Sequence, residues 1–98
     1  MARYDVFRTR GGTLVLDIQS DRLSNLSTRV VVPLRPYEAG MRLFRDLMPV
    51  FMLEQAEVVM VTHQVAAVPL RELGTRIDNL SAHSHEIVAA LDVLLTEG

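Results

Sequence analysis

The chain contains no cysteine, no tryptophan and no lysine, and aromatic residues make up only 5% of its 98 residues. The lack of cysteine excludes a disulfide framework and thiolate chemistry, and it is consistent with a reducing cytoplasm. Because aromatic side chains are so few, the core has to be built from aliphatic residues and methionine.

Long hydrophobic runs are missing as well. The longest apolar runs are about five residues, whereas a membrane-spanning helix needs roughly 20. The N-terminal segment MARYDVFRTR carries charges where a signal peptide has its apolar region, so secretion is not expected. The net charge of −2 provides no general attraction to nucleic acid. We therefore expect a cytoplasmic protein without a membrane partner, for which direct DNA or RNA binding is the weaker hypothesis.

Hydrophobic residues are plentiful, at 49% of the chain, which is well above the level of disordered proteins. A chain of this length forms about one domain and can bury a real core. We therefore expect a single folded domain over residues 1–98.

Alternating runs on either side of a polar loop dominate the first third of the chain. Arg3–Arg8 predicts a short strand, and Thr13–Gln19 and Thr28–Leu34 predict a pair of longer strands with one apolar face each. Between that pair, Ser20–Ser27 is rich in residues that favour turns. Pro33 cannot donate to a strand ladder, so we expect the last strand to end there at an edge or bulge.

The middle of the chain is less regular. Pro36–Met48 has apolar residues at helical spacing, but Gly40 weakens a helix, and both a short helix and an irregular connection remain open. Pro49–Leu53 and Glu57–His63 are apolar runs separated by three residues, which predicts a hairpin.

The C-terminal third is predicted to end in a helix. Gln64–Pro69 is expected to be extended, and Leu70–Leu80 to be a loop with one helical turn that Gly74 breaks. Ser81 is a suitable N-cap for a final amphipathic helix. The apolar stripe of that helix consists of Ile87, Val88, Leu91, Leu94 and Leu95. Together these patterns indicate a β-rich α+β domain.

The sequence shows no set of residues typical of a catalytic site. His83 and His85 are two residues apart and would face different ways on a helix, so we interpret them as exposed rather than metal-binding. His63 follows a strand and is interpreted as a rim residue. We therefore predict a binding protein without a cofactor or a metal.

The remaining charged and polarisable residues have structural interpretations. Asp17 is either solvated or paired with Arg29 across the hairpin, and Asp21 is expected to cap a turn. We expect the methionines to pack mainly in the core, with an adaptable binding surface as the alternative. Those methionines are Met41, Met48, Met52 and Met60. The arginines Arg35, Arg42 and Arg45 are interleaved with acids, which favours a solvated face.

An ordered set of motifs resembles the CcdB family of toxins from toxin–antitoxin pairs. The motifs are DIQSD, TRVVVPL, MVT and AVP, which begin at Asp17, Thr28, Met60 and Ala67, and a final helix over residues 86–95. The resemblance covers nearly the whole chain. It implies an SH3-like, partly open barrel of about five strands, with a small extra sheet, a C-terminal helix and a two-fold homodimer.

The resemblance also implies a non-enzymatic activity. Well-known members of the family poison DNA gyrase by binding its A subunit, and a disordered antitoxin segment neutralises them. Operator DNA is contacted only through the antitoxin. The positions that the resemblance assigns to gyrase binding are Arg22, Leu23, Asp92, Thr96, Glu97 and Gly98.

The last residues depart from the family pattern, which ends in an aromatic or small residue followed by Gly and Ile. This chain ends in Thr96, Glu97 and Gly98. An aromatic anchor at an interface can contribute 2 kcal/mol or more. The altered end therefore supports an alternative, a CcdB-like protein that binds its antitoxin and regulates its operon but does not poison gyrase.

Overall fold

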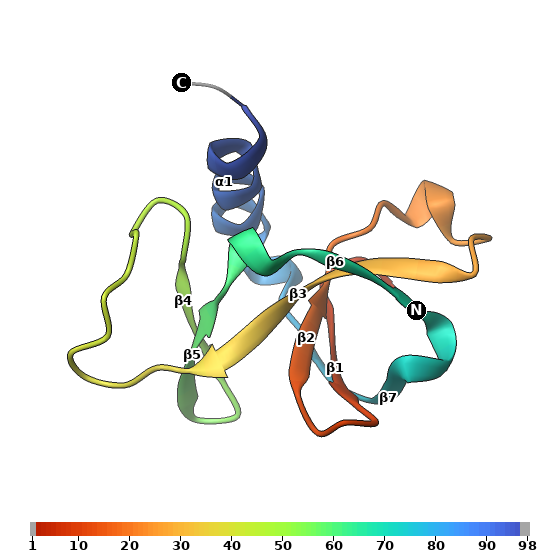
Figure 1. The fold of residues 1–98 in the computed structure, drawn as a ribbon, viewed down its shortest axis with the longest axis horizontal. Coiled ribbons are helices and arrows are strands. Elements are labelled where there is room, and N and C mark those ends of the chain that lie inside the picture. Colours follow the sequence, from red (N-terminus) through yellow and green to blue (C-terminus); the bar gives the residue numbers. More distant parts are fainter. Residues whose placement is uncertain (1, 97–98) are drawn as a thin grey trace.

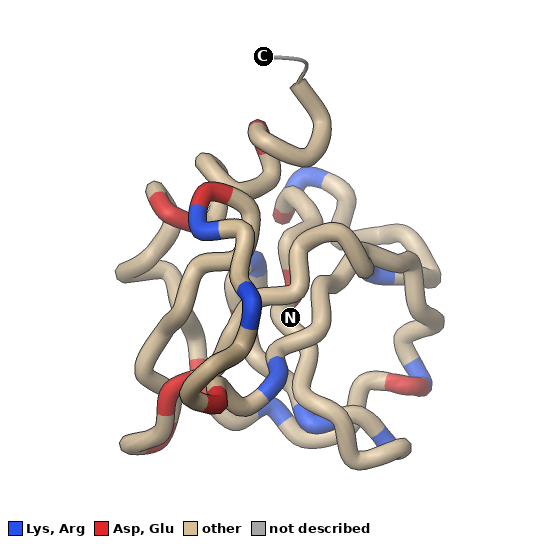
Figure 2. The backbone as a smooth tube through the Cα atoms, turned by 60° about the vertical axis from the view of Figure 1, so that its left-hand side comes forward, with Lys and Arg blue, Asp and Glu red and all other residues tan. Residues whose placement is uncertain are grey.

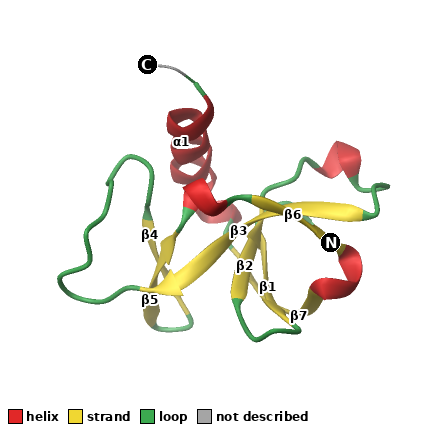
Figure 3. Cartoon of the chain, viewed as in Figure 1, coloured by secondary structure: helices red, strands yellow, loops and turns green. Residues whose placement is uncertain are grey.

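The computed structural model describes residues 2–96, which form a seven-stranded sheet and one α-helix (Figure 1). The strands are β1 (Asp5–Thr9), β2 (Leu14–Asp17), β3 (Thr28–Pro36), β4 (Val50–Leu53), β5 (Ala56–Met60), β6 (Ala66–Pro69) and β7 (Leu73–Asn79). The helix is α1 (Ser84–Leu95). Short 3-10 turns are η1 (Asp21–Leu23), η2 (Thr62–Gln64), η3 (Leu70–Glu72) and η4 (Ser81–His83). Three of these turns connect strands, and η4 leads from β7 into α1; Figure 3 colours the helical segments red and the strands yellow.

Strand β3 is shared by the two parts of the sheet. The strand order is β4-β5-β3-β2-β1-β7, and β6 also pairs with β3. The start of β3 pairs with β6 from Thr28 to Val31, whereas its end pairs with β5 from Leu34 to Pro36. Strands β6, β3, β2, β1 and β7 therefore curl into a partly open, SH3-like barrel, and β5 and β4 extend it as a small extra sheet. The fold expected from the resemblance is confirmed.

Pro33 does not end the strand, contrary to the sequence-based expectation. It lies inside β3, where its Cα partner on β2 is Val15. Its carbonyl accepts a hydrogen bond from the Val61 N–H at 2.9 Å, on the side of β3 away from β2. The N–H and C=O of one strand residue point to the same side. The missing N–H of Pro33 therefore falls between the β6 and β5 segments of the ladder, where no partner strand needs a donor.

Two hydrophobic clusters fill the opposite faces of the sheet. The first is formed mainly by β1, β2, β3, β4, β5 and α1, and it includes Leu16 and Ile87 at 0% exposure. The second, inside the barrel, consists of Phe7, Val15, Val31 and Leu73, with Val68 and Leu70 packed against it. Both faces of β1, β2 and β3 are thus buried, whereas alternation predicts one apolar face.

The predicted hairpin in the middle of the chain is confirmed. Strands β4 and β5 pair from Val50 opposite Val59 to Leu53 opposite Ala56. The two-residue turn is made by Glu54 and Gln55, which both have positive φ, of 50° and 69°. Positive φ at both central residues is the type I′ geometry that matches the strand twist.

Residues 37–49 form an irregular connection with two turns and no helix. The Met48 N–H donates to the Phe44 carbonyl at 2.7 Å, and Gly40 has a φ of +90°. The buried Thr62 hydroxyl donates to the Leu47 carbonyl and ties the connection to η2. The helical spacing of its apolar residues is therefore realised only over the Phe44–Met48 turn.

The helical turn predicted at the start of residues 70–80 is confirmed as η3, but the loop predicted after it is wrong, because residues 73–79 form strand β7. This strand pairs with β1 through an irregular register, from Asp5 opposite Asn79 to Thr9 opposite Leu73. Gly74 does not break the segment but allows this pairing, because a Cβ there would lie 2.4 Å from the Arg8 carbonyl oxygen.

Gly74→Ala is therefore expected to lower the free energy of unfolding by about 1–3 kcal/mol, as overpacking against backbone does. Urea denaturation measures this change. Gly11→Ala is the matched control, because the nearest atom to a Cβ at Gly11 is 3.8 Å away. Equal stability of the two variants would contradict the close approach of β7 to β1.

The final helix begins later than expected, and Ser81 does not cap it. Ser81 opens η4, where its N–H donates to the Asn79 side chain at 2.8 Å, and His83 holds the N-cap position of α1. Ile87 and Ala90 are buried, but Val88 and Leu95 are 37% and 76% exposed. The predicted apolar stripe therefore includes residues, such as Val88 and Leu95, that lie outside the face of α1 that packs against the sheet.

Candidate functional site

The loop over residues 20–27 carries the first two predicted binding positions, Arg22 and Leu23. Ser20 opens η1, and its hydroxyl accepts from the Arg22 N–H at 3.2 Å. Arg22 is exposed, and the Leu23 and Leu26 side chains are each 49% exposed. None of the loop residues is buried, so the loop presents the apolar side chains of its two leucines to solvent.

A buried polar network supports this loop from below. The Arg29 Nε donates to Asp17 Oδ2 at 2.8 Å, and the two side chains are only 1% and 0% exposed. Gln19 as a whole residue is 4% exposed, and its side-chain Nε2 donates to the Leu23 carbonyl at 2.9 Å. The pairing of Asp17 with Arg29 is thus confirmed, and the alternative of a solvated Asp17 is wrong.

The N-terminal residues lie beside the loop, which the sequence did not reveal. The Arg3 N–H donates to Asp21 Oδ1 at 2.8 Å, so Asp21 anchors the N-terminal segment instead of capping a turn. The Arg3 guanidinium lies 4.9 Å from the centre of the Tyr4 ring, within range of a cation–π contact. Tyr4 has a φ of +74°, an uncommon backbone conformation for this residue type. No sequence pattern indicates this arrangement, because it depends on contacts distant along the chain.

The other predicted binding positions lie at the end of α1. Asp92 and Thr96 are exposed, and the Thr96 N–H donates to the Asp92 carbonyl at 2.8 Å. Glu97 and Gly98, which were also predicted to bind, lie outside the described residues. Figure 1 shows that η1 and the C-terminal end of α1 stand apart in one chain. A single subunit therefore does not bring the two groups of residues into one site.

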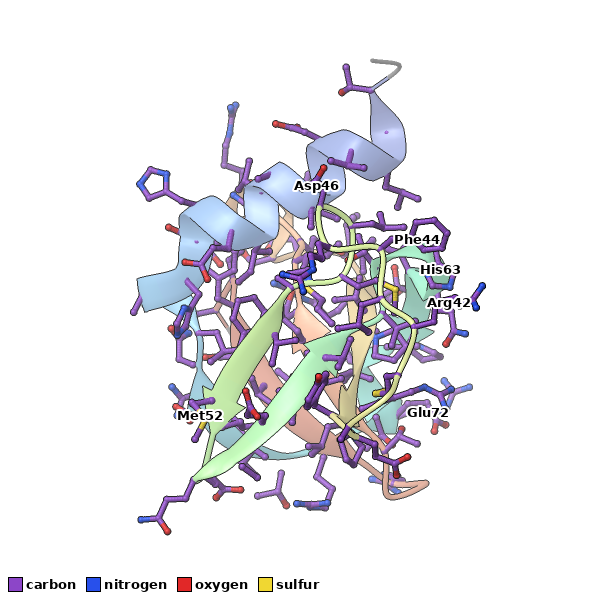
Figure 4. The ribbon with its side chains drawn as sticks, turned by 90° about the vertical axis from the view of Figure 1, so that its left-hand side faces the viewer. Arg42, Phe44, Asp46, Met52, His63 and Glu72 are labelled. Atoms are coloured by element: carbon purple, nitrogen blue, oxygen red, sulfur yellow. The ribbon has the colours of Figure 1, made fainter. Side chains whose placement is uncertain are left out.

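An exposed apolar patch lies between α1 and the connection over residues 37–49. Phe44 is 70% exposed and Val93 is 50% exposed. Phe44, Leu47 and Val93 line a shallow hollow of about 240 Å³, and Asp46 lies at its edge. Figure 4 shows Phe44 and Asp46 on the connection next to α1. Exposed apolar patches often mark surfaces that contact other proteins.

Besides the network of Asp17, Arg29 and Gln19, a second polar cluster surrounds Asp5 at the start of β1. Its burial alone would raise the pKa of the Asp5 carboxyl, but hydrogen bonds from Asn79 and the Ala2 N–H, and the hydrogen bond and charge of Arg76, together lower this pKa. Asn79 Nδ2 and Arg76 Nε both donate to Asp5 Oδ1 at 2.8 Å.

Because the pKa of Asp5 is lower in the folded protein, its ionised carboxylate stabilises the fold above the unfolded pKa of about 4. This stabilisation is lost as the pH falls through the lower, folded pKa. Asp5→Asn is therefore expected to be less stable than the wild type at pH 7, with a difference that shrinks as the pH falls below about 4. Urea denaturation across that range measures it, and a difference independent of pH would contradict the assigned role.

The residues considered for other chemistry do not converge. Among residues 2–96, no group of three or more His, Asp or Glu side chains is placed to hold a metal. His83 is partly buried against the Phe51 ring, at 4.9 Å between ring centres, and lies 3.3 Å from Glu86. His63 and His85 are exposed. In the same range, no helix is long and apolar enough to cross a membrane.

The methionines divide between core and surface. Met60 is fully buried in the core, as predicted, but Met52 is 58% exposed on β4. Met41 and Met48 line a hollow of about 630 Å³ between the connection and the β4–β5 hairpin. The arginines Arg35, Arg42 and Arg45 are exposed as expected, and Figure 2 shows acidic and basic positions on the same side of the molecule.

Comparison with known proteins identifies the family. The model of the CcdB protein family matches residues 3–97, which include every strand and α1. No curated protein matches the chain. The match covers almost the whole length, and the barrel with its extra sheet and terminal helix agrees with it. The chain therefore belongs to the CcdB family, whose members are toxins of toxin–antitoxin pairs.

Proposed function

We propose that the protein is a toxin that inhibits DNA gyrase by binding its A subunit, and that a disordered segment of its antitoxin neutralises it. It acts by binding and not as an enzyme. The observation that carries the proposal is the family match over residues 3–97. The exposed Leu23, on a loop supported by buried hydrogen bonds, would provide an apolar contact at the position that the family resemblance assigns to gyrase binding.

The proposed active form is a two-fold homodimer. The loop over residues 20–27 and the end of α1 stand apart in one chain, so two subunits would be needed to combine them in one surface. The patch formed by Phe44 and Val93 offers apolar area for association. A two-fold dimer that faces a two-fold target makes each contact twice, which raises the overall affinity. Operator DNA would be bound only through the antitoxin.

A second function is favoured by the residue types at positions 96 and 97. Thr96 and Glu97 stand where the family pattern has an aromatic or small residue followed by Gly. A protein that no longer binds gyrase because of these residues would keep antitoxin binding and operon autoregulation. Pull-down with the A subunit separates the two functions. Antitoxin-peptide binding without A-subunit binding would replace the first proposal by the second.

Leu23→Asp is expected to weaken binding to the gyrase A subunit by about 2 kcal/mol, or roughly 30-fold, because an apolar contact is replaced by a charge. Isothermal titration with the A subunit measures the affinity. Stability should change by no more than about 0.5 kcal/mol, because the side chain is half exposed.

Met52→Asp is the matched control, because Met52 is 58% exposed on β4, and β4 and η1 lie at opposite ends of the molecule in Figure 1. This variant is expected to bind like the wild type. Equal losses of affinity for Leu23→Asp and Met52→Asp would remove Leu23 from the proposed binding surface.

A further inference from the structure

Gln19 occupies an unusual position, because a neutral polar side chain is buried directly behind an exposed loop. Its residue is 4% exposed. Its Nε2 donates to the Leu23 carbonyl at 2.9 Å, and its Oε1 accepts from the Val30 N–H at 3.0 Å. One side chain thus links the loop over residues 20–27 to strand β3.

The backbone of Gln19 is held equally firmly. Its N–H donates to Asp17 Oδ1 at 3.0 Å, and its carbonyl accepts from Arg29 Nη2 at 3.4 Å. Asp17 and Arg29 are themselves joined by their ion pair at 2.8 Å. The base from which the Gln19 side chain reaches the loop is therefore fixed by buried charges.

Long-range hydrogen bonds hold the loop near its two ends, from the Arg3 N–H to Asp21 Oδ1 at 2.8 Å and from the Leu70 N–H to the Ser27 carbonyl at 3.1 Å, but not at Leu23. None of the loop residues is buried, and both of its leucines are half exposed. Its internal hydrogen bonds are short-range, such as the Leu23 N–H to the Ser20 carbonyl at 2.9 Å. Loops with few buried apolar contacts lie at the low end of local stability. The hydrogen bond from Gln19 is therefore a major restraint on the Leu23 backbone.

We propose that Gln19 is a positioning residue, whose buried side-chain amide fixes the loop over residues 20–27 in the shape that presents Leu23 to a partner. The effect on gyrase binding rests on the function proposed above. The effect on the loop itself does not, so the two are tested by different measurements.

The loop effect is tested by NMR relaxation of the backbone amides in the full chain. In the wild type, residues 22–26 are expected to have order parameters near 0.85, typical of a rigid backbone, and in Gln19→Met to fall below about 0.6. When its carboxyl is ionised, Gln19→Glu keeps an acceptor for the Val30 N–H but has no donor for the Leu23 carbonyl, so this variant is measured at a pH where the carboxyl is ionised. It is expected to loosen the loop in the same way while Val30 stays ordered, and it decides the test if Gln19→Met does not fold.

Two controls separate positioning from general destabilisation. Gln64→Met removes an exposed glutamine amide, whose bond to Arg35 is long at 3.5 Å. Val58→Ala destabilises the core from β5, where Val58 is 5% exposed, without touching the loop. Both variants are expected to keep wild-type order at residues 22–26.

Binding to the gyrase A subunit supplies the linked readout. Gln19→Met is expected to weaken it about tenfold at a temperature where the variant stays folded, while Val58→Ala binds like the wild type. Unchanged order at residues 22–26 in Gln19→Met, or equal loosening in Val58→Ala, would overturn the positioning role. Failure of the wild type to bind the A subunit would instead refute the proposed function and leave the loop measurement to decide the role of Gln19.

Discussion

Arg29→Met is expected to lower the free energy of unfolding by about 3–5 kcal/mol, because it leaves the Asp17 carboxylate buried without its partner. Both side chains are almost completely removed from water, at 1% and 0% exposure. The substitution keeps most of the side-chain volume, so the loss reports the charge rather than a cavity. Urea denaturation at pH 7 measures it.

Arg76→Met is the matched control for this prediction. Arg76 also pairs with an aspartate at 2.8 Å, but its side chain is 55% exposed. The Asp5 carboxylate is buried, at 4% exposure, but keeps its hydrogen bonds from Asn79 and the Ala2 N–H, so the control should lose less stability than Arg29→Met.

The double variant Asp17→Leu with Arg29→Met is expected to recover much of the loss, since replacing both members of a buried pair with apolar residues is often neutral. Equal stability of Arg29→Met and the wild type would show that Asp17 is not held as a buried ion.

Ile87→Ala is expected to lower the free energy of unfolding by about 2–5 kcal/mol, the usual range for truncating a fully buried isoleucine. Ile87 is 0% exposed and lies in the core cluster beneath α1 with Leu16 and Leu80. This residue fastens the helix to the sheet. Thermal or urea denaturation followed by circular dichroism measures the change.

Val88→Ala is the corresponding control on the same helix. Val88 is next in sequence but 37% exposed, so its truncation should cost less than about 1 kcal/mol. If both substitutions had the same effect, α1 would have to dock through a different face.

The local pattern of the sequence predicts those elements that are decided by neighbouring residues. The hairpin of β4 and β5 follows from two apolar runs close together, and the pairing of Asp17 with Arg29 from their places on adjoining strands. The family resemblance, and not the periodicity, predicts how these elements close into a barrel.

The elements that were predicted wrongly depend on contacts between distant segments. Strand β7 has weak alternation and contains Gly74, whose role is visible only beside the Arg8 carbonyl. Pro33 is tolerated inside β3 because the neighbouring strand changes from β6 to β5 at that point. Neither circumstance leaves a pattern in the local sequence.

The residues of the candidate site can be predicted from the sequence, but their arrangement on the surface of the protein cannot. Arg22, Leu23, Asp92 and Thr96 follow from the resemblance, and all four are exposed. Their spatial relation, and the support that Gln19 gives to Leu23, require the fold.

The proposed activity is tested most directly by incubating the purified protein with DNA and gyrase from the same source, and measuring cleaved DNA trapped on the enzyme. We predict that cleaved complexes accumulate in proportion to the protein, and that a peptide from the antitoxin prevents this. Gyrase that relaxes and supercoils DNA normally, without cleaved complexes at a large excess of folded protein, would contradict the proposed activity.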